Sequence, residues 1–288
     1  MSSRAGPGFS LRVTSGLNSS EWTGKTKHLP EMRLVPRVAL FPTCLVDVMR
    51  PAVGFAAARL LEQAGCAVTV PEGLTCCGQP AFNSGDRKTA RTLARRTMAR
   101  LKDFDFVVIP SGSCAGMMVQ HYPELFAPDT EDHAAARDLA ARCHELTQFL
   151  VRVIKVEKLA AEFPARATYH DSCAGLRELG IKTEPRQLLR QVAGVSLTEM
   201  ADAEVCCGFG GTFCVKYPDI STRMVDKKVE KIIASGADTL VAGDLGCLMN
   251  MAGRLKRLGS DIKVRHVAEV LAGDHETPPM ADEGGDAA

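Results

Sequence analysis

Eight cysteines of this 288-residue chain fall into two sets of four with the same internal order. Each set contains two adjacent cysteines followed by glycine, in the stretches TCCGQP and VCCGFGG. The members of the second set follow those of the first by 129, 130, 130 and 133 residues, so the chain contains an internal repeat. The two sets are Cys44, Cys76, Cys77 and Cys114, and Cys173, Cys206, Cys207 and Cys247.

The chemistry that suits these sets is metal binding. Thiolates are soft ligands that select zinc, copper(I) or iron–sulfur clusters, and a set of four matches the ligand count of zinc or of a cluster. Structural zinc sites usually separate paired cysteines by about two to four residues, whereas adjacent thiolates suit two different iron atoms of a cluster. Gly78 and Gly208 would let the backbone turn sharply beside the metal. The spacing favours one iron–sulfur cluster per set, and the repetition argues against plain burial.

Strand-like and helical stretches alternate in the same order around both sets, with helices expected at 51–64 and 184–193. Such alternation predicts parallel sheets, which place their sites at the C-terminal ends of the strands. We therefore predict an α/β fold of two pseudo-symmetric Rossmann-like units with cysteine-rich loops at those strand ends. The predicted strands are VALF (38–41), CAVTV (66–70), FVVIP (106–110), ATY (167–169), VSLTEM (195–200) and TLVAG (239–243).

The helices after the CCG loops are predicted to begin at the N-caps Asp86 and Asp219. The stretch 134–158 is predicted to be a helix that closes the first unit, and 265–273 is its expected counterpart in the second.

Composition places the folded part of the chain at residues 35–272. We predict a first cysteine-rich unit at 35–160, a second at 161–272, a disordered N-terminal extension at 1–34 and a disordered acidic tail at 273–288. The net charge of +1, from 35 basic and 34 acidic residues, indicates no nucleic-acid partner, and no apolar run is long enough for a transmembrane segment. Eleven cysteines without an export signal are typical of a reducing compartment. The chain is therefore expected in the cytoplasm, reaching a membrane only through partners.

Several residues near the two sets have weaker support. His170 and Asp171 precede the first cysteine of the second set and are the candidate catalytic residues, because an imidazole there would relay protons or donate to a cluster sulfur. A structural histidine at the strand end is the alternative. Cys214 lies seven residues after the second CCG pair, which suits an extra ligand or a resolving thiol. Two cysteines without a counterpart in the other unit, for which plain burial is expected, are Cys66 and Cys143.

The stretches CLVD, GCAVTVPEGLTCCGQPAFNSG, YHDSCAGLRELG and CCGFGGTF resemble the lactate-utilization branch of the cysteine-rich CCG-domain iron–sulfur oxidoreductases, the family that includes the CCG-domain component of heterodisulfide reductase. The resemblance covers about residues 37–272. It implies an iron–sulfur protein that acts with two partner proteins to oxidise L-lactate to pyruvate. In heterodisulfide reductase, each CCG domain holds a non-cubane [4Fe-4S] cluster through five cysteines, the last two in a CxxC motif.

Both units of this chain depart from that five-cysteine pattern. Where the first cysteine of CxxC would stand, the chain has Ser111 before Cys114 and Asp244 before Cys247. Four thiolates per unit suit an ordinary [4Fe-4S] cluster, or zinc in one unit and iron in the other. An oxygen of Ser111 or Asp244 is the remaining candidate for a fifth ligand.

Two motifs that are absent narrow the expected function. The chain has no C-x2-C-x2-C-x3-C ferredoxin run and no dinucleotide fingerprint, so at least one partner is expected to carry ferredoxin-type clusters. The leading hypothesis is an iron–sulfur subunit of an L-lactate oxidising assembly, rather than a complete enzyme. The alternatives are the equivalent subunit of a glycolate or glycerol 3-phosphate dehydrogenase, and a zinc-stabilised adaptor without catalytic activity.

Overall fold

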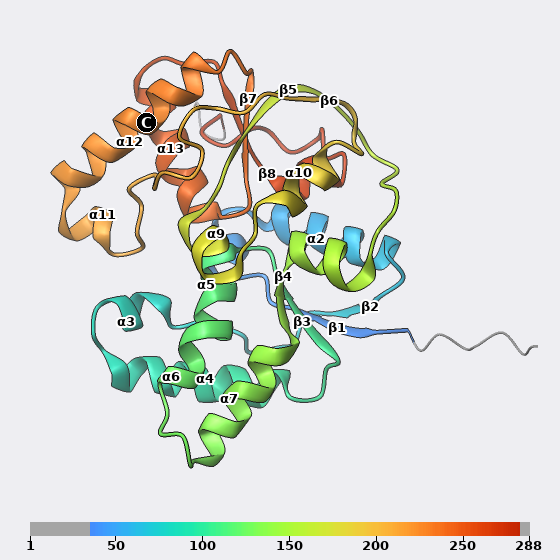
Figure 1. Cartoon of the computed structure of the whole chain (residues 1–288), viewed down its shortest axis with the longest axis vertical. Coiled ribbons are helices and arrows are strands. Elements are labelled where there is room, and N and C mark those ends of the chain that lie inside the picture. The colour runs from blue at the N-terminus through green and yellow to red at the C-terminus, as the bar shows by residue number, and fades with distance from the viewer. Residues whose placement is uncertain (1–34, 283–288) are drawn as a thin grey trace, which may run out of the picture. The chain divides into compact units, whose positions relative to one another are not determined.

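Two four-stranded parallel sheets form the framework of the protein (Figure 1). The structure is a computed structural model that describes residues 35–282. The strand order is β2-β1-β3-β4 in the first sheet and β6-β5-β7-β8 in the second, so the two sheets share one topology. This arrangement confirms the predicted α/β fold with two parallel sheets. The strands are β1 (Arg37–Leu40), β2 (Ala67–Thr69), β3 (Phe106–Ile109), β4 (Cys143–Glu145), β5 (Glu162–His170), β6 (Ala193–Leu197), β7 (Thr239–Ala242) and β8 (Lys263–His266).

Helices connect the strands and cover the sheets (Figure 1). The helices of the first half are α1 (Cys44–Met49), α2 (Pro51–Gln63), α3 (Gln79–Asn83), α4 (Arg87–Leu101), α5 (Gly112–Gly116), the π-helical η1 (Met117–His121), α6 (Tyr122–Glu124), α7 (Glu131–Arg142), α8 (Leu146–Gln148) and the π-helical η2 (Phe149–Ile154). Those of the second half are α9 (Cys173–Leu179), α10 (Thr183–Leu189), α11 (Phe213–Lys216), α12 (Pro218–Ala234), α13 (Leu245–Arg257) and α14 (Val267–Leu271).

Strand register shows how closely the two sheets correspond. Leu40 pairs with Val108 in the first sheet, and Tyr169 pairs with Val241 in the second. These pairs differ by 129 and 133 residues, the same offsets that relate the first and the fourth cysteines of the two sets. The repeat in the sequence is therefore a repeat of strand positions, which places equivalent residues at equivalent strand ends.

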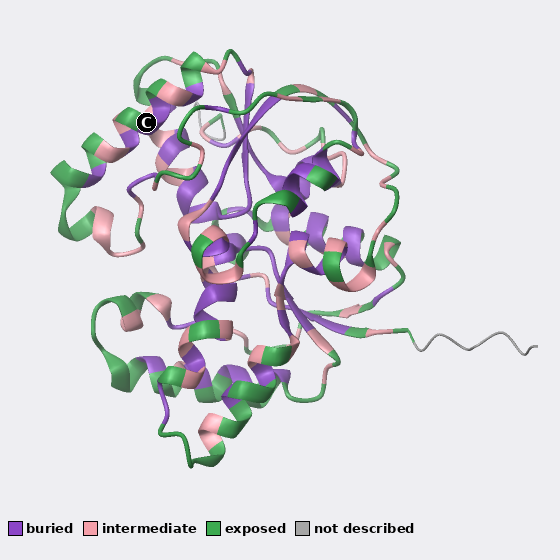
Figure 2. Ribbon diagram, in the orientation of Figure 1, coloured by how far each residue is buried: buried purple, intermediate pink, exposed green. Residues whose placement is uncertain are grey.

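Alternate residues of β1 face opposite sides of its sheet, as the period of two in a strand requires. Val38 and Leu40 belong to a hydrophobic core that continues through the second half of the chain. Ala39 and Phe41 belong to a second core, formed with α4 and α7. Figure 2 shows the buried residues gathered along both sheets. Burial on both faces explains why these strands have no polar alternation.

Buried contacts join the two halves. The Arg50 guanidinium, at the start of α2, donates to the Glu269 carboxylate in α14 over 2.7 Å, and both side chains are buried. The helices α5 and α9 cross where Gly112 and Gly175 meet, because a Cβ on Gly112 would lie 2.9 Å from the Gly175 Cα. A buried ion pair and a close contact between two glycines both require a defined geometry. They therefore hold the two halves in one arrangement.

Some local predictions were wrong. The stretch 134–158 is not one helix, because β4 follows α7 and supplies the fourth strand of the first sheet. Its expected counterpart, 265–273, likewise begins in β8. Asp86 does cap α4 through a bond from the Thr89 N–H, but α12 starts at Pro218 and places Asp219 inside its first turn. The strands β4 and β8 were missed because they continue directly into α8 and α14, so no turn signal in the sequence separates them from the helical pattern.

Of the two terminal segments that were expected to be disordered, the structure describes only part of the C-terminal one. Residues 1–34 and 283–288 lie outside the described residues. Residues 273–282, which their composition assigned to a loose tail, contact the second half instead. The Met280 N–H donates to the Val264 carbonyl over 3.0 Å, and the Met280 side chain is buried. The Pro278 carbonyl accepts from Arg50 over 2.7 Å. One apolar side chain and main-chain hydrogen bonds are enough to hold a polar segment.

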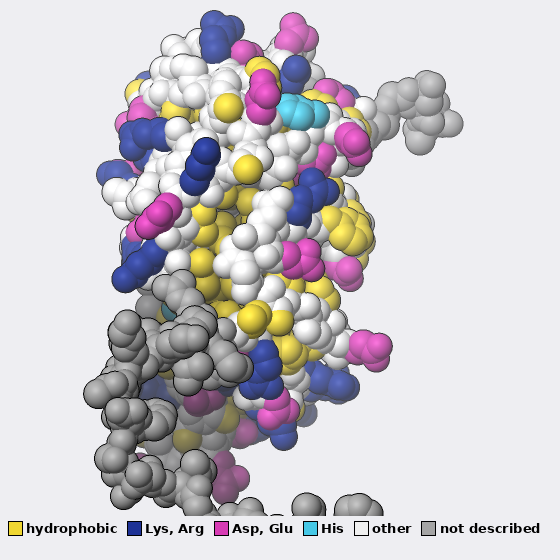
Figure 3. Space-filling model, turned by 90° about the vertical axis from the view of Figure 1, so that its right-hand side faces the viewer, with side chains coloured by type: hydrophobic (Ala, Val, Ile, Leu, Met, Phe, Trp, Pro, Cys, Tyr) yellow, Lys and Arg dark blue, Asp and Glu magenta, His cyan; other side chains and the backbone are white. Residues whose placement is uncertain are grey.

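The surface carries both signs of charge without separation on the face that Figure 3 shows, in keeping with the net charge of +1. Among residues 35–282, no helix combines the length and the apolar character that crossing a membrane would require.

Candidate metal-binding sites

The cysteines of the first set lie at the C-terminal ends of three adjacent strands. Cys44 is the first residue of α1 and follows β1, Cys76 and Cys77 follow β2, and Cys114 lies in the first turn of α5 after β3. The Cys77 thiol donates to the Cys114 sulfur over 3.2 Å. A hydrogen bond also joins Cys44 to Cys76. Four residues that span 71 positions of sequence, from 44 to 114, therefore meet at one place.

The second set repeats this arrangement on the second sheet. Cys173 is the first residue of α9 after β5, Cys206 and Cys207 follow β6, and Cys247 lies in the first turn of α13 after β7. Hydrogen bonds link Cys206 to Cys173 and to Cys207, and Cys207 to Cys247. The structure therefore brings together both sets that the sequence repeat predicted.

Contacts within each set single out one thiol whose pKa is strongly lowered. Hydrogen bonds from Cys44 and Cys77 lower the pKa of the Cys76 thiol to about 2. Hydrogen bonds from Cys173 and Cys207 do the same for Cys206, whose pKa is also about 2. Each set thus contains one thiol that is stabilised as the thiolate, the form that binds metal.

The glycine after each cysteine pair has a left-handed backbone. The φ angle is 89° at Gly78 and 87° at Gly208, a region that side chains with a Cβ rarely adopt. The two positions differ in their surroundings. A Cβ on Gly208 would lie 2.8 Å from the Ser221 carbonyl oxygen, whereas the nearest atom to a Cβ on Gly78 is 3.5 Å away, in Leu93. The turn needs glycine in both sites, and in the second site close packing needs it as well.

A cavity of about 240 Å³ adjoins the first set. All four cysteines of that set line it, and its opposite wall comes from the second half. Phe209 and Gly246 of this wall lie next to the second set in sequence, because Phe209 is two residues after Cys207 and Gly246 directly precedes Cys247. The Phe209 ring packs against Gly246, where a Cβ would lie 2.4 Å from the ring. Residues next to the second set in sequence therefore also line the space beside the first.

Ser111 and Asp244, the candidates for a fifth ligand, act as helix caps and contact each other. Ser111 Oγ accepts from the Cys114 N–H over 3.4 Å, and Asp244 Oδ1 accepts from the Cys247 N–H over 3.5 Å. The Ser111 hydroxyl also donates to Asp244 Oδ2 over 3.1 Å, and the same oxygen accepts from the Ser113 N–H over 3.0 Å. Both residues line the cavity, but the Ser111 hydroxyl and the two carboxylate oxygens of Asp244 already have hydrogen-bond partners.

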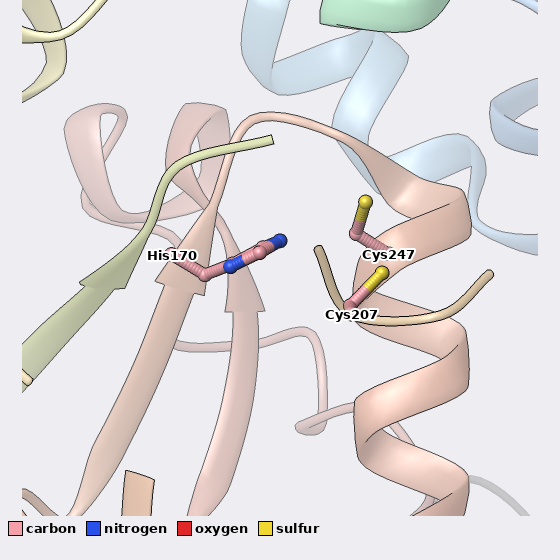
Figure 4. A group of neighbouring side chains, drawn as sticks. All are labelled: His170, Cys207 and Cys247. Atoms are coloured by element: carbon pink, nitrogen blue, oxygen red, sulfur yellow. The ribbon is translucent and has the colours of Figure 1, made fainter. Parts of the chain in front are cut away.

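His170 reaches the second set. It is fully buried at the end of β5, and its imidazole extends toward Cys207 and Cys247 (Figure 4). One ligand atom from each of these three residues lies within 4.8 Å of the other two, which is close enough to share one metal ion. Neither ring nitrogen makes a hydrogen bond of normal geometry among the described residues, although the Ala203 carbonyl lies close enough to raise the pKa of the ring. Burial and the charge of Lys228 lower the pKa of His170 to about 3, so the ring is neutral and able to bind metal.

Asp171 points to a different partner. Its carboxylate accepts two hydrogen bonds from the Arg186 guanidinium, over 2.8 and 2.9 Å, and this pair is buried. Arg186 also donates to the Glu199 carboxylate over 2.6 and 2.9 Å. A carboxylate held in this way anchors the turn between β5 and Cys173, and its oxygens are already engaged.

The remaining cysteines lie apart from these contacts. The Cys214 thiol, in α11, donates to the Gly211 carbonyl over 3.3 Å, and Gly211 lines the cavity of the first set. Cys66 and Cys143 are buried, and burial raises the pKa of both thiols, to about 12 for Cys143. These two residues show the environment of a thiol that only fills a core.

Sequence reasoning missed the charged residues that support the second set. Lys228, in α12, is buried, and its ammonium donates to the carbonyls of Asp202 and Ala203 in the loop before Cys206. Arg186 was missed in the same way. A lysine or an arginine in a helical stretch is usually exposed to solvent, so only the tertiary structure shows that Lys228 and Arg186 are buried.

The donor chemistry of both sets fits a metal or an iron–sulfur cluster. Each set offers four thiols that lie together, and the second adds a buried imidazole that no described residue meets in a hydrogen bond of normal geometry. Buried polar groups without partners are rare in folded proteins, and a metal ligand is one of their accepted explanations.

Comparison with known proteins agrees with this chemistry. The model of a family described as "Cysteine-rich domain", CCG, matches residues 38–119 and 167–252, one match in each half. Lactate utilization protein A of Shouchella clausii (strain KSM-K16) is 51% identical over 234 residues, which cover 81% of this chain and 98% of that protein. The protein of the same name from Bacillus subtilis (strain 168) is 47% identical over 235 residues, 82% of this chain and 98% of that protein.

A solved structure shares the fold. It is described as a hypothetical protein from Helicobacter pylori, and it matches with a TM-score of 0.57 at 12% sequence identity. The match covers 84% of this chain and 49% of that chain, so this chain spans about half the length of that protein. At this identity the likeness concerns the fold alone.

Proposed function

This chain belongs to the cysteine-rich CCG family, and from that membership we propose that it is an iron–sulfur subunit of a system that oxidises L-lactate to pyruvate. Each set of four cysteines holds one cluster, of the [4Fe-4S] type, and the subunit transfers electrons rather than completing the reaction alone. Removal of two electrons and two protons converts L-lactate to pyruvate, and partner proteins with ferredoxin-type clusters take up the electrons.

The observation that carries this proposal is the shared wall between the two sets. The cavity beside the first set is closed by Phe209 and Gly246, which adjoin cysteines of the second set. Two cofactors held in these positions would be neighbours, as an electron relay requires. When bound, the clusters supply one-electron redox chemistry at potentials that their ligands and burial set.

The residues of this chain have separate tasks in the proposal. The cysteines hold the clusters, and Gly78 and Gly208 let the backbone turn beside them. Ser111 and Asp244 cap the helices that carry the fourth cysteine of each set. The Phe209 ring, which packs against Gly246, gives the space beside the first set an apolar wall.

Metal analysis tests the cofactor. Anaerobically purified protein should contain iron and acid-labile sulfide, and the variants Cys77→Ser and Cys207→Ser should each lose about half of both. Cys66→Ala is the matched control, because Cys66 is a buried cysteine outside both sets, and it should keep the full amount. Zinc without iron or sulfide would instead support the alternative of a zinc-stabilised adaptor without catalytic activity. The three close ligand atoms of His170, Cys207 and Cys247 would also suit a zinc ion.

Growth tests the pathway. Deletion of the gene should abolish growth on L-lactate and spare growth on pyruvate, and extracts of the deletion strain should lack lactate-dependent reduction of an artificial electron acceptor. Normal lactate oxidation in those extracts would exclude this role. If the protein contains iron but its deletion leaves lactate oxidation normal, the alternative of a subunit of another respiratory dehydrogenase would be favoured.

A further inference from the structure

The two sets differ at one position that the repeat makes equivalent. His170 stands three residues before Cys173, and Phe41 stands three residues before Cys44. The residues just before them, Leu40 and Tyr169, occupy matching places in the two sheets. The second site therefore has an imidazole where the first has a phenyl ring.

The neighbours of these two side chains correspond as well. Phe41 packs in one hydrophobic core with Cys77 and Cys114. His170 points toward Cys207 and Cys247 (Figure 4), the equivalent cysteines of the second set. Phe41 has no atom that binds a metal, whereas His170 places a ring nitrogen within 4.8 Å of both sulfurs.

An imidazole in this place needs a partner. His170 is fully buried, and neither nitrogen makes a hydrogen bond of normal geometry among the described residues, although the Ala203 carbonyl lies near the ring. Burying a polar group without a partner costs free energy, and the equivalent phenyl ring would avoid that cost. A metal bound by the nitrogen would offset it, as histidine is the commonest nitrogen ligand of protein metals.

We propose that His170 is an additional ligand of the second cluster, beside its four cysteines, so that the two sites have different donor sets. This inference rests on the proposed function, because it requires a cluster in the second site. A neutral nitrogen donor leaves less negative charge on a cluster than a thiolate does, and histidine ligands raise the potential of iron–sulfur centres for that reason. His170 then gives the second cluster a higher reduction potential than a thiolate in the same place would.

Isotope labelling tests the ligand without altering the fold. The full-length protein is purified anaerobically with ¹⁵N-histidine and with natural histidine, reduced, and measured by pulsed EPR. We expect a strong nitrogen coupling that changes with the isotope. It should be absent from His170→Cys and present in His266→Asn, the control, because His266 is also fully buried but its Nδ1 accepts from the Ala268 N–H.

Redox titration gives a second readout. His170→Cys should keep the iron and sulfide of the wild type and lower the midpoint potential of one cluster only, because a thiolate replaces a neutral donor. Iron and sulfide at wild-type amounts without a histidine coupling, or with unchanged potentials in His170→Cys, would overturn the inference and leave the proposed function intact. Wild-type protein without iron would overturn both.

Discussion

The Ser111 hydroxyl donates to Asp244 Oδ2 over 3.1 Å, which joins the two positions at which the five-cysteine pattern would place a cysteine. The two residues are 133 positions apart in the chain and occupy equivalent places in the two halves. Each also caps the helix that carries the fourth cysteine of its set. The residues that replace the missing cysteines therefore connect the two sites to each other.

This contact should stabilise the fold without binding metal. Ser111→Ala and Asp244→Ala should each lower the free energy of unfolding by about 1 to 2 kcal/mol, because each removes a helix cap and a buried hydrogen bond. In urea denaturation, a double-mutant cycle should give a coupling of at least about 0.5 kcal/mol. Iron content should stay at the wild-type amount, and a loss of iron in Ser111→Ala would show that the hydroxyl is a ligand.

The two CCG glycines should differ in their tolerance of alanine. Both have a left-handed backbone, so Gly78→Ala and Gly208→Ala should each lose about 1 to 2 kcal/mol from strain. Gly208→Ala should lose about 1 to 3 kcal/mol more, because its Cβ would lie 2.8 Å from the Ser221 carbonyl oxygen. Urea unfolding of the two variants measures the difference, and equal losses would contradict the packing argument.

The stability that the buried ion pair near the second site provides should depend on the geometry of its hydrogen bonds. Arg186→Lys keeps the charge but loses the paired hydrogen bonds to Asp171, so it should lower the free energy of unfolding by about 2 to 4 kcal/mol. Arg166→Lys is the matched control, because Arg166 pairs with Asp238 and their side chains are 70% and 45% exposed. That change should cost less than about 1 kcal/mol in the same assay. Similar costs for the two variants would show that the buried pair has no special role.

Glu145 should make stability depend on pH. Burial raises the pKa of its carboxyl from the usual 4.5 to about 7, so the folded state binds this proton more tightly than the unfolded state. The contribution is present below pH 4.5 and is lost as pH rises from 4.5 to about 7, a change of about 3 kcal/mol. Glu145→Gln removes the titrating group, so its stability relative to the wild type should rise across that window.

Urea unfolding at several pH values measures this difference. The buried histidines titrate in both proteins, so their effects cancel in the comparison. Glu62→Gln, at an exposed position, controls for the loss of a carboxyl group. A constant difference between Glu145→Gln and the wild type from pH 4.5 to 7 would contradict the prediction.

The central strands, the long helices and both cysteine sets could be predicted from the sequence, because their signals lie within a few residues of one another. The strands β4 and β8 could not, since each continues directly into a helix and no turn signal marks where the strand ends. His170 was visible as a candidate because it stands beside Cys173. Its contact with Cys207 and Cys247 came only from the structure, as did the supporting roles of Lys228 and Arg186.

By itself, the sequence determined that two equivalent four-cysteine sets sit at the ends of parallel strands. That information is local and repeated, and strand and helix periods reveal it directly. Only the tertiary structure decided that Phe209 and Gly246 close the cavity beside the first set and that Ser111 meets Asp244. Packing between the two halves creates these contacts, and no local pattern in the sequence records them.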